Sequence, residues 1–396
     1  MYSNESMCLI HQFGGAFKYQ PEELKTEISD RAGDLIKRAF ADVDPIKLVD
    51  YHTHVAGLGS SGSGAFVNPK MLSWRHPFHR LKFKVFVSAG GIQDELRADD
   101  QFTDRLVRLA GNIEGHGKYR LLAFDKNYNR DGSENLAKTE FYVPNDHVLS
   151  IAGQHPSLFE PVISVNPYRL DALTELERGA QRGARMVKWL PNAMGIDPAD
   201  RLCDPFYQKM KELGLVLLSH GGEEKAVEAE EDQKLGNPLL LRRALDHGVR
   251  VIIAHCAGLG DNEDLDDPQR KRLPNFDLFL RLMGEKRYEG LLFADISAMT
   301  QFNRAGTPLR TILQREDLHE RLVNGSDYPL PAINVLIRTG TLQRRGYISQ
   351  EERACLNEIY DYNPLLFDFV LKRTLQLPGT GKRLPASVFM TNSGLS

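Results

Sequence analysis

Eight short apolar segments alternate with helical patterns along this chain, and this alternation limits the folds that it can adopt. Several segments are nearly continuous hydrophobic runs, such as 215–218 and 251–254, which are typical of parallel strands buried on both faces. The stretches between strands often begin with Pro or an acidic residue and end at Gly, as helices do. The predicted strands span residues 46–54, 119–125, 159–165, 184–190, 213–220, 249–255, 289–297 and 321–327.

Eight strand–helix repeats predict an α/β fold, a (β/α)8 barrel of the TIM type. A doubly wound open sheet is the alternative. Such a sheet would not bring the ends of the first, fourth, fifth, sixth and eighth strands together, because its strands do not form a ring. We predict that the barrel covers residues 46–376, with additional helices in 333–376, and that residues 1–45 and 377–396 form an N-terminal extension and a C-terminal tail.

The connection after the first strand, residues 55–117, is too long for an ordinary βα loop and is predicted to be an insertion. It begins with a stretch rich in Gly and Ser and then becomes basic and aromatic, with Trp74 and Phe78 among its residues. It could be a lid over the barrel mouth, or a surface that contacts a partner or a membrane interface. The interpretation that we favour is a helical insertion whose aromatic side chains pack against the barrel.

The two ends of the chain carry weaker signals. In the N-terminal extension, residues 8–13 and 16–19 predict a small hairpin around Gly14-Gly15, and 22–41 predicts one amphipathic helix. The C-terminal tail is rich in Pro, Gly and Ser, and we expect it to be either disordered or draped over a neighbouring molecule.

The composition narrows the classes of partner. The formal net charge is −3, so no basic field would draw the chain to nucleic acid. No apolar run approaches the ~20 residues of a membrane span, and residues 1–20 lack the pattern of a signal peptide. The four scattered cysteines lack CxxC spacing and indicate free thiols in a reducing compartment, which predicts a cytoplasmic protein.

The first strand ends in Asp50-Tyr51-His52-Thr53-His54. Residues i and i+2 of a strand point the same way, so His52 and His54 are predicted to project two imidazoles to one side. Imidazole is the commonest metal-ligating side chain, and the pair therefore indicates two corners of a transition-metal site. Two histidines in five residues also arise by chance. Against chance, four further predicted strands carry a candidate ligand near or at their ends: Lys188, His220, His255 and Asp327.

These motifs resemble the amidohydrolase superfamily, and most closely its amidohydrolase-related branch, which includes metal-dependent decarboxylases and lactonases. The likeness runs from about Leu48 to Leu371 and rests on an ordered HxH…His…His…Asp set. The segments that carry it are the first-strand HxH, 159–169, 183–198, Ser219–Glu223, Ala254–Gly258, Asn324–Pro329 and the Asn-Pro signature in Tyr362–Phe367.

The resemblance implies that His52, His54, His220 and Asp327 bind Zn²⁺, with Mn²⁺ or Fe²⁺ as alternatives. Asp327 would also take a proton from the attacking water and deliver it to the leaving group. His255 would polarise a substrate carbonyl or bind a second metal ion.

Lys188 has three interpretations that the sequence leaves open. Once carboxylated, it could bridge two ions, and His220 and His255 would then bind the second ion. It could instead anchor a substrate carboxylate at a site with one ion. The third interpretation is a structural lysine paired with an acid, although lysine is rarely buried in an apolar run such as 186–189.

We therefore expect a metal-dependent hydrolase, in which metal-activated water attacks a C–N or C–O bond of a small carboxylate, amide or lactone. A metal-dependent decarboxylase or hydratase, a lyase acting on an unsaturated or aromatic acid, is the alternative that the same ligands allow. A barrel that has lost catalysis and binds a partner is a lesser alternative. The expected partner is a small-molecule acid or its amide or lactone, and a homo-oligomer is left open.

Several polar residues at strand ends have two interpretations each. Asp295 ends the seventh strand and could contact the substrate or make a structural hydrogen bond. Cys256 is expected to be a small buried residue rather than a nucleophile. The other candidates for the lining of the pocket follow strand ends: Arg169, Asn192, Glu223, Arg304 and Tyr328.

Overall fold

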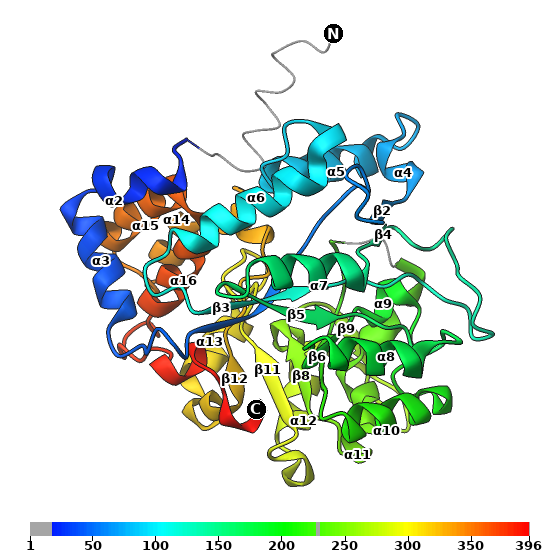
Figure 1. Cartoon of the computed structure of the whole chain (residues 1–396). Helices are drawn as coiled ribbons and strands as arrows, with labels where there is room; N and C mark the ends of the chain where they lie inside the picture. The colour runs from blue at the N-terminus through cyan, green and yellow to red at the C-terminus, as the bar shows by residue number, and fades with distance from the viewer. Residues whose placement is uncertain (1–17, 227–229, 396) are drawn as a thin grey trace.

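The computed structural model describes residues 18–226 and 230–395, which contain eight parallel strands arranged in a barrel (Figure 1). The ring closes where Tyr51 N donates to Asn324 O (2.9 Å) and Asp327 N donates to His52 O (2.7 Å). The predicted (β/α)8 barrel is confirmed, and every predicted strand overlaps an observed one. The strands are β1 (Val49–His54), β3 (Lys118–Leu122), β5 (Phe159–Ile163), β6 (Met186–Trp189), β7 (Val216–His220), β8 (Val251–Ala254), β11 (Leu292–Asp295) and β12 (Leu322–Val323).

The interior of the barrel is filled by apolar side chains from all eight strands. Because neighbouring residues of a strand face opposite ways, each strand contributes alternate residues to this cluster. The members are Val49, Tyr51, Leu122, Val162, Met186, Val216, Leu218, Ile252, Ala254, Phe293, Val323 and Leu395. The barrel interior is therefore a packed core, and polar chemistry can only begin beyond it, toward the carboxyl ends of the strands.

Helices cover the outside of the barrel (Figure 1). Their starts follow capping rules: Ser349 and Glu352 form a capping box, and the Asn363 side chain accepts from the backbone N–H groups of Leu365 and Leu366. None of the helices in the described part of the chain has the length and apolar character that crossing a bilayer requires. The larger helices after β3 are α7 (Asn145–Gln154), α8 (Ala172–Gln181), α10 (Asp204–Glu212), α12 (Asn275–Met283), α13 (Thr307–Gln314), α15 (Gln350–Tyr362) and α16 (Pro364–Thr374).

The segment between β1 and β3 is mostly helical. Its aromatic residues fall into two groups, because Phe83 is buried whereas Trp74 is 74% and Phe78 85% exposed. The interpretation that the aromatics pack inward is thus right for Phe83 and wrong for the other two. The elements of this segment are β2 (Phe66–Val67), α4 (Pro69–Leu72), α5 (Pro77–Ala89) and α6 (Ala98–Gly111), and β2 pairs with β4 (Phe141–Tyr142).

The single helix predicted over 22–41 is wrong, because the chain breaks into α2 (Leu24–Glu27) and α3 (Asp30–Phe40). Ser29 causes the break: its side chain caps α3 by accepting from Ala32 N. The Glu358 carboxylate also accepts from the N–H (2.6 Å) and the hydroxyl (2.7 Å) of Ser29, which fixes the corner. The predicted hairpin over 8–13 and 16–19 lies largely outside the described residues.

Within its described residues, the C-terminal tail packs against its own barrel, so the expectation of a disordered tail is wrong there. Val388 and Phe389 are fully buried, and Val388 O accepts from Asn324 N (2.8 Å). Leu395 joins the apolar cluster of the barrel interior. The sparse apolar residues of this segment gave no periodic signal, yet each one is used for packing.

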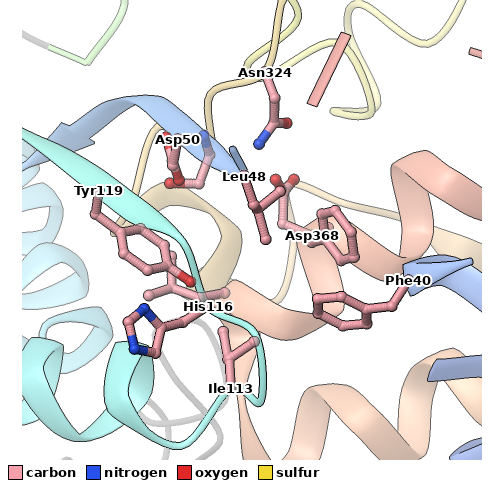
Figure 2. Close-up of a pocket in the computed structure, with 11 residues that line it drawn as sticks. Phe40, Leu48, Asp50, Ile113, His116, Tyr119, Asn324 and Asp368 are labelled. Carbon is pink, nitrogen blue, oxygen red and sulfur yellow. Dashed lines mark hydrogen bonds between the residues drawn. The ribbon is translucent and has the colours of Figure 1, made fainter. Parts of the chain in front are cut away.

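A buried hydrogen-bonded contact between a lysine and a carboxyl group joins α16 to the loop that follows β12. Lys372 Nζ donates to Asp368 Oδ2 (2.5 Å), one turn earlier on the helix, and to Gly325 O (2.6 Å). Figure 2 shows Asp368 and Asp50 on the wall of a cavity of about 20 Å³ between β1, α3 and α16. Burial raises the pKa of Asp368 to about 7, although the Lys372 ammonium opposes this shift.

This shift predicts how the stability of the protein depends on pH. The folded protein holds a proton on Asp368 up to about pH 7, whereas the unfolded chain releases it near pH 4. The carboxyl therefore stabilises the fold fully below about pH 4, and this contribution is lost as the pH rises through 7. Urea unfolding should show that wild type loses about 3 kcal/mol relative to Asp368→Asn between pH 5 and 8. A difference between the two proteins that does not change with pH would contradict this prediction.

Candidate metal centre

A β-bulge in β1 sets the direction of the two histidines. Asp50 pairs with Tyr119 and Thr53 with Leu121, so three steps along β1 match two steps along β3. One extra residue reverses the faces to which later side chains point. Tyr51 can therefore belong to the apolar interior of the barrel while His52 and His54 project at its carboxyl end.

Other strands reach the same level without a bulge. Lys188, His220 and Asp295 each lie two residues after an inward-facing apolar residue, namely Met186, Leu218 and Phe293. Alternation thus turns all three side chains inward, one layer above the apolar core. All three are almost fully buried. The polar layer is therefore a direct continuation of the pattern that builds the core.

His52, His54 and Asp327 form the tightest cluster. The Nε2 atoms of the two histidines are 3.1 Å apart. Asp327 Oδ1 lies 3.4 Å from Nε2 of His52 and 3.2 Å from Nε2 of His54. Although burial alone would raise the pKa of the Asp327 carboxyl, His52 and His255 hold that pKa well below its usual range. The carboxyl is therefore an ionised acceptor.

Asp295 assigns the tautomer of His52. One carboxylate oxygen accepts from the N–H of His255 (2.9 Å) and from the N–H (3.0 Å) and hydroxyl of Ser297. The other oxygen lies 2.8 Å from His52 Nδ1. Burial opposes ionisation of Asp295, but His52 lowers the pKa of this carboxyl well below its usual range. An ionised Asp295 can only accept, so His52 donates from Nδ1 and keeps its lone pair on Nε2.

Ser297 determines the tautomer of His255. The Ser297 hydroxyl donates its only proton to Asp295. It can therefore only accept from His255 Nδ1, which lies 2.7 Å away. This leaves His255 Nε2 as the acceptor, 3.8 Å from Asp327 Oδ2. His255 also has a left-handed backbone with φ of +55°, and such strain is concentrated at functional sites.

His220 and Lys188 lie beside the cluster. His220 Nδ1 is 3.5 Å from Glu224 Oε2, while its buried Nε2 has no hydrogen-bond partner in the part of the chain that the structure describes. Burial lowers the pKa of His220 to about 4, so the ring is neutral at physiological pH. Lys188 Nζ lies 3.2 Å from His52 Nε2, and burial lowers the pKa of this lysine to about 8.

The donor set fits a divalent cation. Ligand atoms on a tetrahedral zinc ion, at about 2.0–2.1 Å each, are about 3.3–3.4 Å apart. The separations of 3.1–3.4 Å among His52, His54 and Asp327 agree with this spacing. Two lone pairs that face each other at 3.1 Å repel unless a cation or a proton lies between them. The predicted ligands His52, His54 and Asp327 are thus brought together, and a second set of close donors contains His52, His255 and Asp295.

The predicted fourth ligand, His220, is in neither of these sets. Its ring centroid lies 5.3 Å from that of His255, so it borders the cluster. Its role as a ligand stays a prediction, supported by the unpartnered Nε2. Asp295 and Ser297 orient the two rings; the role of Asp295 could not be decided from the sequence, and Ser297 was not predicted as a site residue. The available signal for Asp295 was its position two residues after the buried Phe293.

A glycine makes the close packing behind His52 possible. A Cβ atom on Gly325 would lie 2.6 Å from Cβ of His52 and 3.3 Å from Cβ of Ser297. We expect Gly325→Ala to displace His52, to lower the free energy of unfolding by about 2 kcal/mol and to weaken zinc binding at least about tenfold. Zinc titration against a chromogenic chelator measures the second effect. Gly33→Ala is the matched control, because nothing lies within 4 Å of its Cβ, and unchanged zinc affinity in Gly325→Ala would refute the expectation.

Solved structures with a similar fold include three bacterial proteins. An uncharacterised TIM-barrel protein of Bordetella bronchiseptica is 16% identical, with 72% of this chain and 86% of that chain covered and a TM-score of 0.45. A proposed 2-pyrone-4,6-dicarboxylic acid hydrolase of Pseudomonas putida is 18% identical, with 72% of this chain and 83% of that chain covered and a TM-score of 0.42. The 5-carboxyvanillate decarboxylase of Sphingomonas paucimobilis is 12% identical, with 88% of this chain and 97% of that chain covered and a TM-score of 0.47. A search of curated proteins gives no significant match.

The sequence itself matches a family model. The match covers residues 129–334, about half of the chain, and the model is described as amidohydrolase. The matched span includes β5 to β12, and with them Lys188, His220, His255, Asp295 and Asp327. The HxH motif of β1 lies before it, so the match and the motif are separate observations. This chain is a member of the amidohydrolase family.

Proposed function

We propose that the protein is a metal-dependent hydrolase that cleaves a C–N or C–O bond of a small carboxylate, amide or lactone. The observation that carries the proposal is the convergence of His52 Nε2, His54 Nε2 and the Asp327 carboxylate within 3.4 Å of one another. Membership of the amidohydrolase family supports the hydrolase class. A divalent cation held there would supply Lewis acidity, which lowers the pKa of water and polarises a carbonyl group.

The residues of the proposed metal site have different roles in binding the ion and in transferring protons. His52, His54 and Asp327, with His220 as the fourth donor, would hold the ion, which we propose to be Zn²⁺ with Mn²⁺ or Fe²⁺ as substitutes. Asp327 also accepts a proton from the attacking water and returns it to the leaving group, because its carboxyl is ionised and lies beside the point where the ion would be held. His255 donates from Nδ1 to the Ser297 hydroxyl and stays neutral. Its Nε2 remains an acceptor on the side of Asp327.

Lys188 determines the number of ions. Its buried Nζ lies 3.2 Å from His52 Nε2, and burial lowers its pKa to about 8, so a good fraction of the amine is neutral near physiological pH. A neutral amine is the form that carbon dioxide carboxylates. Two equivalents of metal in wild type, falling to one or none in Lys188→Met, would support a bridging carbamate. One equivalent in wild type would favour the protonated lysine as a substrate anchor.

The test of the function uses the purified full chain. Elemental analysis gives the bound metal, and a panel of lactones, N-acyl amino acids and aromatic acids is assayed by proton release and by carbon dioxide release. We expect turnover of a lactone or an amide that a chelator abolishes and added Zn²⁺ or Mn²⁺ restores. Carbon dioxide from an aromatic acid would instead make the protein a lyase. A protein that binds no added metal would overturn the proposal.

A further inference from the structure

Arg304 is a buried arginine beside the metal-site cluster that no step above uses. It lies on the loop between β11 and α13, nine residues after Asp295. Its stem packs over the turn that follows His255, because a Cβ atom on Gly258 would lie 3.6 Å from Arg304 Cδ. The residue is 7% exposed. The side chain therefore lies at the carboxyl end of the barrel, where the ligands of barrel proteins bind.

The guanidinium group of Arg304 is only partly satisfied. Nη1 donates to Gln301 Oε1 (3.1 Å), but the buried Nε has no hydrogen-bond partner within residues 18–226 and 230–395. Among the residues that the structure describes, Arg304 has no carboxylate within ion-pair distance, although a buried charge is usually paired. An unpaired buried donor on a charged group costs free energy that a protein normally avoids. A ligand that accepts from this donor would remove the cost.

The charges around Arg304 favour an anion. The acids that act on its guanidinium most strongly are Asp327 and Glu224, followed by Asp295. These three carboxylates face two cations, Lys188 and Arg304, so the cluster has one net negative charge. A divalent cation would convert this to one net positive charge when Lys188 is protonated. The next acid, Glu223, is already paired with Lys225 (3.4 Å).

We propose that Arg304 binds a carboxylate group of the substrate, so that the substrate is an anion held at two points, the metal ion and this guanidinium. Arginine suits the role, because its planar fork donates two parallel bonds to a carboxylate and it remains charged when buried. The alternative is an internal counter-ion for Asp327 and Glu224. That role would require a direct ion pair, and none is present among the described residues. The inference rests on the proposed function, because it requires a cation at the neighbouring site.

The test uses full-length protein loaded with Co²⁺, whose visible absorption changes when an anion enters the metal site. Oxalate, malonate, succinate and glutarate are titrated as probes, with acetate and propionate as monocarboxylate references. We expect one of the dicarboxylates to bind wild type about tenfold to a hundredfold more tightly than either monocarboxylate. Arg304→Met should lose this preference, and Arg304→Lys should retain part of it, since an ammonium keeps the charge without the fork.

Arg315→Met is the matched control. It removes one guanidinium from the same part of the chain, but Arg315 is exposed and paired with Asp317. This variant should keep the full dicarboxylate preference. If Arg304→Met, with unchanged Co²⁺ content and circular dichroism, also keeps it, the inference about Arg304 is wrong and the proposed function stands. A wild type that takes up no Co²⁺ overturns the proposed function and, with it, this inference.

Discussion

Asp327→Asn is expected to abolish turnover while most of the bound metal remains. The amide has the shape of the carboxylate and keeps one oxygen that can face His52 and His54. It loses the negative charge and the capacity to accept a proton from water. Loss of a positioned general base costs about a hundredfold to ten-thousandfold in rate. The measurement is kcat on the substrate that the panel identifies, with metal content determined on the same sample.

Asp317→Asn is the matched control for this variant, because Asp317 is exposed and paired with Arg315. It changes the net charge by the same amount and should leave kcat unchanged. Undiminished kcat in Asp327→Asn would refute the role of Asp327 in proton transfer. Loss of metal together with loss of activity would instead show that the charge of Asp327 is needed to hold the ion.

Asp295→Asn is expected to weaken metal binding about tenfold to a hundredfold, although Asp295 need not touch the ion. The amide oxygen should take the position that accepts from His255 N and Ser297 N. The NH₂ group then faces His52 Nδ1, which lies 2.8 Å from the carboxylate in wild type. His52 must accept there, so the proton moves to Nε2 and the lone pair that would bind the metal is lost.

Zinc affinity measured by competition with a chromogenic chelator tests this argument. Ser297→Ala is the matched comparison, since it removes the partner of His255 Nδ1 but leaves the contact between Asp295 and His52. We expect this variant to bind zinc more tightly than Asp295→Asn does. Equal zinc affinity in wild type and Asp295→Asn would contradict the assignment of the His52 tautomer.

Much of this site could be predicted from the sequence, because its residues continue the periodicity of the strands. The apolar runs located all eight strands, and ligands at strand ends followed from the carboxyl-end rule for barrels. The bulge in β1 could not be predicted, since a bulge depends on pairing with β3. Without it, the i, i+2 spacing of His52 and His54 would place the pair on the face opposite Tyr51.

Features that depend on long-range contacts were the ones that the sequence missed. The break at Ser29 is fixed by Glu358, more than three hundred residues away. The role of Asp295 depends on contacts with His52 on β1 and with His255, the residue that follows β8. His220 was predicted to be a metal ligand, and this role stays a prediction; the structure places its ring beside that of His255. Local pattern indicates which residues face inward, and tertiary packing decides how close they come.

One measurement tests the shared cation most directly: an anomalous difference map from crystals of the zinc-soaked protein, recorded at the zinc absorption edge. We expect a strong peak about 2.0–2.2 Å from His52 Nε2, His54 Nε2 and a carboxylate oxygen of Asp327. An ion that binds elsewhere, or three ordered side chains with no peak between them, would show that these residues do not share a cation.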